Sequence, residues 1–145
     1  MYRRILIPTD TSAPSQRGID ASIRLASALG AEVVGLAVTA QYRVWKLDAG
    51  QMKMSPEQYA AHCEQRARDI LEDITRAALN AGVACRVLHA VSGSPYEAII
   101  AAARDQQCDL VSMAAHGARG LRGLLLGSET QKVLEHSTVP VLVHR

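Results

Sequence analysis

The strongest constraint on the fold is a regular alternation of short apolar runs with longer stretches of helical periodicity. Short apolar runs are typical of strands buried on both faces, and apolar residues spaced by three and four are typical of amphipathic helices. The expected strands are residues 4–9, 31–40, 83–91, 108–115 and 139–145, and the expected helices are residues 13–29, 56–81, 95–107 and 128–136. This βαβαβαβαβ order predicts an α/β fold with a parallel sheet and right-handed crossovers.

Residues that start and stop helices support these boundaries. Serine is a preferred N-cap, proline suits the first helical position, and glycine ends helices in the left-handed conformation. The expected N-caps are Ser12, Ser55 and Ser94, followed in two cases by Pro56 and Pro95, and the expected stops are Gly30 and Gly82. In the helix over residues 56–81, we expect the buried stripe to contain Cys63, Ala67, Ile70, Ile74, Ala77 and Ala81.

Length and composition narrow the class of protein. A chain of 145 residues suits one domain, here residues 1–145. The net charge of +2, without a basic stripe interleaved with aromatic residues, argues against nucleic-acid binding. The first apolar run, Ile5 to Ile7, is too short for a signal peptide or a membrane span, so we expect a cytoplasmic protein. The three cysteines lack CxxC spacing and the histidines lack ligand spacing, so no metal site is expected.

The predicted topology also indicates where a ligand would bind. In open parallel sheets, ligands bind outside the carboxyl ends of the strands, near the point where the strand order reverses. The segments at these ends are Thr9–Asp10, Val38–Thr39, Val91–Ser92 and residues 114–117. From the residues alone, Asp10 is either a ligand contact or a turn residue ahead of the first helix.

The glycine-rich stretch AAHGARGLRGLLLGSETQKV, residues 114–133, matches neither common phosphate motif. It contains no GxG, and the spacing from Gly123 to Gly127–Ser128 differs from that of a Walker A loop and lacks its lysine. The expected helix start after Gly127 nevertheless offers unpaired backbone amides and the positive end of a helix dipole, which favour an anion. The alternative is that Ser128 is an ordinary N-cap behind a flexible loop.

The stretch HGARGLRGLLLGSETQKVLEHSTVPVLVHR resembles the end of a universal stress protein. The nucleotide-binding branch of that family carries the pattern G-x2-G-x9-G-[S/T], which here reads Ala114-x2-Gly117-x9-Gly127-Ser128. The segments ILIPTDTSAPSQRGID, SGSPYEAII and CDLVSMAAHG resemble earlier parts of the family, so the resemblance extends over the chain. It implies a doubly wound, five-stranded Rossmann-like sheet of the adenine nucleotide alpha hydrolase type, with helices on both faces.

The resemblance implies an adenine-nucleotide site built from four segments. Asp10, flanked by Pro8 and Thr9, would contact the ribose or base side of the nucleotide, and the backbone of Val38 would contact adenine. The ribose and phosphates would contact Met113, Ala114, His116 and Gly117. The phosphates would also contact Gly127, Ser128 and Thr130. Two positions depart from the pattern. Ala114 replaces its first glycine, and its methyl group would crowd the ligand; Glu129 replaces a small apolar residue, and we expect its carboxylate to point to solvent.

The resemblance implies binding of ATP, with Mg²⁺ accompanying the triphosphate, in a stress-response or signalling role with at most slow hydrolysis or autophosphorylation. The alternative is a dimeric interaction protein that binds AMP, another small ligand or no nucleotide, which Ala114 and Glu129 favour. An enzyme acting on another substrate would rest on fold analogy alone.

The last expected strand suggests self-association. Val139, Val141 and Val143 alternate onto one face of a strand at an expected sheet edge, and apolar edges usually find a partner. The resemblance implies a two-fold homodimer through this strand. The alternative is that the strand is covered within one chain.

Overall fold

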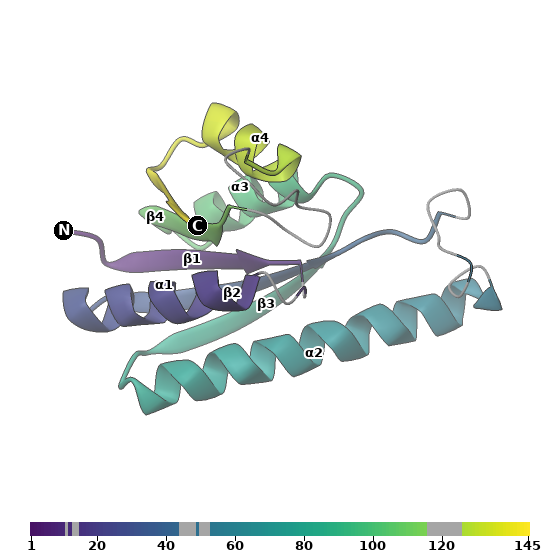
Figure 1. The fold of residues 1–145 in the computed structure, drawn as a ribbon, viewed down its shortest axis with the longest axis horizontal. Helices are drawn as coiled ribbons and strands as arrows, with labels where there is room; N and C mark the ends of the chain where they lie inside the picture. Colours follow the sequence, from purple (N-terminus) through teal and green to yellow (C-terminus); the bar gives the residue numbers. More distant parts are fainter. Residues whose placement is uncertain (11, 13–14, 44–48, 50–52, 116–125) are drawn as a thin grey trace.

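The computed structural model describes residues 1–10, 12, 15–43, 49, 53–115 and 126–145 (Figure 1). Five strands alternate with four helices along these residues. The elements are β1 (Arg4–Thr9), α1 (Ser15–Leu29), β2 (Glu32–Thr39), α2 (Pro56–Asn80), β3 (Cys85–Val91), α3 (Pro95–Asp105), β4 (Leu110–Ala114), α4 (Ser128–His136) and β5 (Val141–His144). No helix in these ranges is long and apolar enough to cross a membrane.

All strand pairs in the sheet are parallel, and the strand order is β3-β2-β1-β4-β5. The chain therefore runs outward from β1 to β3, crosses back, and continues through β4 to β5 on the other side. The parallel α/β sheet predicted from the alternation of runs is confirmed, and the reversal confirms the doubly wound order that the resemblance implied. It places β1 at the centre of the sheet and leaves β3 and β5 at its edges.

Helices cover both faces of the sheet, with α1 and α2 on one side and α3 and α4 on the other (Figure 1). Because side chains alternate along a strand, β1 contributes Ile5 and Ile7 to the core under α1 and α2, and Leu6 to the core under α3 and α4. All three side chains are inaccessible to solvent or nearly so. This two-sided burial is the physical reason for the unbroken apolar run at the start of the chain.

Most of the predicted helix signals are confirmed. Gly30 and Gly82 have φ angles of 63° and 68°, the left-handed conformation expected of helix stops. Ser55 accepts a hydrogen bond from the amide of Gln58, whose side chain accepts one from the Ser55 amide, so α2 begins with a complete capping box.

Two local predictions are confirmed only in part or not tested. Helix α1 is described from Ser15, the Ser12 hydroxyl donates a hydrogen bond to Asp10, and residues 13–14, where the expected helix begins, lie outside the described residues. Of the stripe expected in α2, Ala67 and Ile74 are fully buried and Ile70, Ala77 and Ala81 are partly buried against the same core, but the fully buried residues also include Tyr59, Leu71 and Ala78. Apolar leucine and alanine residues also flank the expected positions, so the sequence allows more than one face of α2 to be buried. Packing against β2 and β3 determines which face it is.

Edge strand β5 is attached to α1 through a buried polar cluster. Ser22 of α1 donates to the carbonyl oxygen of Gly18 and lies 2.6 Å from the hydroxyl of Ser112 on β4, which lies 2.8 Å from Nε2 of His144 on β5. A fourth contact joins the Ser22 hydroxyl and Nε2 of His144 at 3.2 Å. Because the Ser22 proton goes to the carbonyl oxygen of Gly18, the Ser112 proton goes to Ser22, and neither hydroxyl has a proton left for Nε2. His144 therefore carries its proton on Nε2 and donates toward Ser112. Burial, and next the charge of Arg24, lower the pKa of His144 below its ordinary value.

We expect the stability of the protein to fall as the pH drops below about 6.5, the ordinary pKa of histidine. Because the pKa of His144 is lowered in the folded state, the unfolded chain binds more protons between the two pKa values, and the free energy of unfolding decreases toward lower pH. Urea unfolding across this range should show a weaker pH dependence for His144→Gln than for the wild type. His62→Gln on the exposed surface of α2 is the matched control; equal slopes in all three proteins would contradict the prediction.

Candidate functional site

The strand order reverses between β1 and β4, and this point defines the candidate site. The two strands are hydrogen-bonded neighbours whose connections leave toward opposite sides of the sheet. A crevice at such a reversal is the usual ligand site of doubly wound folds. Asp10 follows β1 and Ala115 follows β4, so both lie at the carboxyl end of the sheet.

Most of the residues implied by the resemblance gather at this end. The ends of β1, β2 and β4, with the residue that follows β1, contain Pro8, Thr9, Asp10, Val38, Met113 and Ala114. The start of α4 contains Gly127, Ser128, Glu129 and Thr130. His116 and Gly117 lie outside the described residues. Val38 and Met113 are buried in the core under α3 and α4, so only their backbones are placed to meet a ligand.

Helix α4 is fixed to the end of β4 by hydrogen bonds to two carbonyl groups. The amide of Gly127 donates to the carbonyl oxygen of Ala115 at 2.9 Å. The Thr130 hydroxyl lies 3.1 Å from the same oxygen and 3.3 Å from that of Ala114. Thr130 is only 3% exposed. Its hydroxyl proton is thus used inside the protein to position the helix, so a phosphate contact of Thr130, as the resemblance implies, would have to use its backbone amide.

Among the described residues, no side chain caps the first turn of α4. Gly127, rather than Ser128, is the N-cap residue, and the first bond of the helix runs from the amide of Gln131 to the carbonyl oxygen of Gly127. The alternative in which Ser128 is an ordinary N-cap is therefore wrong. Among the described residues, no acceptor faces the amides of Ser128, Glu129 and Thr130, which leaves the donors of this helix end available to an anion.

The methyl group of Ala114 faces helix α1. A Cβ atom placed on Gly18 of α1 would lie 3.0 Å from the Ala114 amide nitrogen and 3.2 Å from its methyl carbon. Ala114 also shares its side of β4 with Ser112, which contacts α1 through Ser22. The methyl that replaces the first glycine of the pattern is therefore packed against α1.

Glu129 points to solvent only in part, because its side chain is 37% exposed and its carboxylate is bound on both oxygens. Its Oε2 accepts a hydrogen bond from the Tyr96 amide in the first turn of α3 at 3.0 Å, and its Oε1 lies 3.1 Å from Nζ of Lys132. Ser94 occupies the N-cap position of α3 but makes no side-chain cap, so Glu129 supplies the cap from another helix. The ammonium group of Lys132, 5.5 Å from the centre of the Tyr96 ring, offsets the charge of the carboxylate.

Asp10 has the turn role that the sequence left open. Its Oδ1 accepts a hydrogen bond from the Ser12 amide at 3.0 Å and another from the Ser12 hydroxyl. This arrangement is an Asx turn, which directs the chain from β1 toward α1. It holds the carboxylate of Asp10 at the carboxyl end of the sheet.

The other side of the site contains Thr39, which the sequence placed at a strand end, together with His89, Arg43 and Gly93, which it did not single out. The hydroxyl oxygen of Thr39, at the end of β2, lies 2.8 Å from Nε2 of His89 on β3. Arg43 lies beyond β2, and a Cβ atom on Gly93 would come within 2.9 Å of its guanidinium group. The signal for this close approach was Gly93 itself, two residues after β3, because a glycine lets another group approach the backbone closely. Gly18 is the corresponding signal inside α1, where glycine is otherwise unfavourable.

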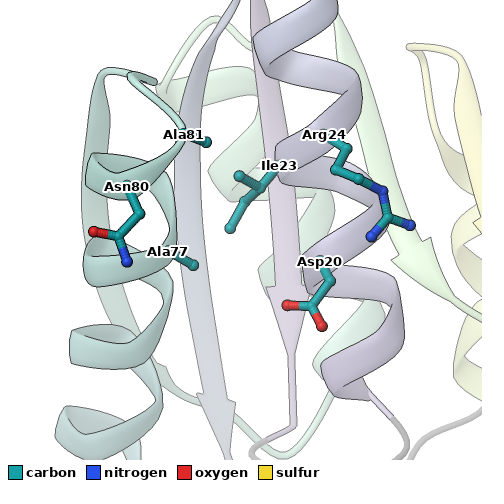
Figure 2. A pocket seen from close by; sticks show the side chains of 6 residues that line it. All are labelled: Asp20, Ile23, Arg24, Ala77, Asn80 and Ala81. Carbon is teal, nitrogen blue, oxygen red and sulfur yellow. The ribbon is translucent and has the colours of Figure 1, made fainter.

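Two surface depressions lie along α1. One, of about 280 Å³, lies between α1 and the end of α2 and is lined by Asp20, Ile23, Arg24, Ala77, Asn80 and Ala81 (Figure 2). The other, of about 460 Å³, lies between α1 and β5. Within the described ranges, no group of three or more His, Cys, Asp or Glu residues could hold a metal ion.

Comparison with known proteins agrees with this architecture. The model of the universal stress protein family matches residues 1–145. The chain belongs to the universal stress protein family. Two relatives that it resembles over nearly their whole lengths are the universal stress protein MJ0577 of Methanocaldococcus jannaschii, 28% identical over 99% of this chain and 94% of the relative, and YxiE of Bacillus subtilis, 28% identical over 100% of both.

Solved structures of universal stress proteins share the fold. The structure of MJ0577 has a TM-score of 0.81 and 26% identity, covering 99% of this chain and 95% of that one. A universal stress protein in complex with cAMP has a TM-score of 0.70 and 23% identity, covering 99% of this chain and 97% of the other. An Arabidopsis thaliana family member with AMP bound has a TM-score of 0.64 and 15% identity, covering 97% and 90%.

In this universal stress protein, we expect Glu129→Ala to lower the free energy of unfolding by about 1 kcal/mol, the usual contribution of a helix cap. Glu129→Gln should cost less, because its amide oxygen can still accept from the Tyr96 amide. Glu135→Ala, on the exposed face of the same helix, is the control and should change the free energy by less than about 0.5 kcal/mol. Urea unfolding measures all three, and equal losses for Glu129→Ala and Glu135→Ala would show that the cap contributes nothing.

Proposed function

We propose that this universal stress protein binds an adenine nucleotide at the carboxyl ends of β1, β2 and β4 and works as a stress-response or signalling module. The observation that carries the proposal is the uncapped first turn of α4, fixed to Ala115 beside the sheet reversal. Its amides, which meet no acceptor in the described part of the chain, and the positive end of its dipole suit a phosphate group. Asp10, with Pro8 and Thr9 beside it, faces the ribose or base in this arrangement, and the backbone of Val38 faces adenine.

ATP is the proposed ligand, accompanied by Mg²⁺, which bridges phosphate oxygens and offsets their charge. Ser128 is exposed at the first position of α4, so its hydroxyl adds a donor to the backbone amides of the phosphate end. Met113, Ala114, His116 and Gly117 supply the ribose and phosphate segment. Turnover is at most slow, because the chain has no Walker lysine beside these phosphates.

A nucleoside monophosphate is the second candidate ligand. Two solved structures of this fold are described with cAMP and with AMP, and a third, of a universal stress protein from Archaeoglobus fulgidus, is described in complex with dAMP. Glu129 adds a negative charge to the first turn of α4, which opposes a triphosphate more strongly than a monophosphate.

Two substitutions at Ser128 separate the hydroxyl group from the backbone amide. Ser128→Ala removes the hydroxyl and keeps the amide, whereas Ser128→Pro removes both. Proline is tolerated at the first helical position, and Gly127 already has φ −60° and ψ 150°, which suits a residue before proline. We expect Ser128→Pro to weaken nucleotide binding about tenfold more than Ser128→Ala, since a hydrogen bond to a charged group is lost.

Calorimetric titration with ATP–Mg²⁺, ADP and AMP measures this difference and ranks the ligands. If AMP binds more tightly than ATP–Mg²⁺ and ADP, the proposed ligand is a nucleoside monophosphate and not ATP. Unchanged binding in Ser128→Pro would place the nucleotide elsewhere, and absence of heat with all three at millimolar concentration would reject the proposed function. Thermal unfolding of each variant shows whether α4 remains folded.

We also propose a two-fold homodimer through β5. The carbonyl groups of Pro140 and His144 accept hydrogen bonds from β4, so by the two-residue period of a strand the amides of Val141 and Val143 face the open edge. Leu142, 38% exposed, and Leu134 of α4, 42% exposed, add apolar surface near this edge. An unpaired edge with apolar surface beside it favours pairing with a second copy.

Val143→Pro should convert the dimer to a monomer, because it removes an amide from the open edge and leaves the bonds to β4 in place. Light scattering after size exclusion should give twice 15.6 kDa for the wild type and 15.6 kDa for the variant. Val143→Thr keeps the amide and is the control. A wild-type mass of one chain at micromolar concentration would exclude the dimer.

A further inference from the structure

The depression between α1 and β5 has the charge of an anion site. Seven residues line its roughly 460 Å³: Arg17, Asp20, Ala21, Arg24, Val143, His144 and Arg145. Those from α1 recur at spacings of three and four, so they form one stripe of the helix, next to the stripe of Ile19 and Ile23 that faces the core. The side chains bring three guanidinium groups and one carboxylate to the same depression.

The three arginines have no partner in the described part of the chain. Neither Arg17, Arg24 nor Arg145 makes a hydrogen bond or ion pair there, whereas Arg68 and Arg76 on α2 are paired with acids of their own helix. Arg24 extends from the side of α1 that faces away from α2 (Figure 2). The one acid in the depression, Asp20, accepts a hydrogen bond from Gln16. An excess of unpaired positive charge therefore lines the depression.

His144 adds a second, independent observation. Its Nε2 donates to the serine cluster, where it lies 2.8 Å from the Ser112 hydroxyl and 3.2 Å from the Ser22 hydroxyl. Its Nδ1 makes no hydrogen bond with the described residues, so the imidazole has one fixed nitrogen and one that is open to protonation. The charge of Arg24 reaches this ring, because it contributes to lowering the pKa of His144. An anion in the depression would offset that charge and allow Nδ1 to donate to it.

We propose that this depression binds a phosphate group, held by Arg17, Arg24 and Arg145 and by the imidazole of His144. Guanidinium groups bind phosphate through paired hydrogen bonds, and three of them match the several oxygens of a tetrahedral anion. None of the seven lining residues is assigned to the proposed nucleotide site, but His144 is the strand partner of Ala114 and its carbonyl oxygen accepts a hydrogen bond from the Ala115 amide, so the two sites are neighbours. The phosphate site does not depend on the proposed nucleotide binding.

The test is a titration with inorganic phosphate near neutral pH, followed by the NMR signals of the His144 ring and of the amides around it. Sodium chloride at matched ionic strength controls for screening. Saturable shifts confined to phosphate are expected; equal shifts in chloride would overturn the proposal.

Variants that remove a positive or a negative charge from the depression test the proposal further. Arg17→Gln and Arg24→Gln should each weaken phosphate binding about tenfold, through loss of a charge-assisted hydrogen bond, and Asp20→Asn should strengthen it. Arg68→Gln and Arg76→Gln make the same change of net charge on α2 and should leave binding unchanged. Equal weakening by the α2 variants would show that only net charge matters and would reject the site.

A second arm tests whether the site is separate from the nucleotide site. With saturating AMP present, phosphate should shift the His144 signals with the same affinity. Loss of the phosphate effect in AMP would assign the depression to the nucleotide site and overturn a separate site. If AMP itself does not bind, the phosphate titration and its variants remain decisive. Light scattering with and without phosphate excludes a change of oligomeric state as the cause of the shifts.

Discussion

The hydrogen bonds from Gly127 and Thr130 to the carbonyl oxygen of Ala115 determine how the candidate site is assembled. They fix the start of α4 to the end of β4, at the edge where β1 and β4 meet. Without them, the free amides of the helix would have no fixed position relative to Asp10 and the strand ends. Burial of Thr130 stabilises the arrangement, because its hydroxyl has no water to replace the carbonyl partners.

Glu129 joins the two helices that cover the same face of the sheet. Its carboxylate caps α3 while its backbone belongs to the free first turn of α4, so one residue affects both helix ends. Lys132 offsets the charge, and the aromatic rings of Tyr96 and His136, 5.3 Å apart, extend the contact between the helices. The electrostatic effect of Glu129 on an incoming anion is therefore set by tertiary contacts.

Much of the fold could be predicted from the sequence, because its signals are local. The run from Ile5 to Ile7 is apolar since the strand is buried on both faces, and Gly30 and Gly82 end helices through their own φ angles. The α2 stripe could be located only in part, because Ile70 and Leu71 are both apolar and only contact with the sheet distinguishes them. The partner of Glu129 lies 33 residues away along the chain, which no local pattern reveals. Ser94, with Glu97 three residues later, resembles a capping box but makes no such bond.

The close approach of Gly18 to β4 links distant parts of the molecule mechanically. An added methyl group would lie 3.0 Å from the backbone of Ala114, a separation at which atoms repel, so α1 would have to shift. Ser22 is one turn further along this rigid helix and would shift with it, away from Ser112 and His144. One added carbon atom at Gly18 would thus displace α1 and, through Ser22, disturb the contacts that attach the edge strand β5.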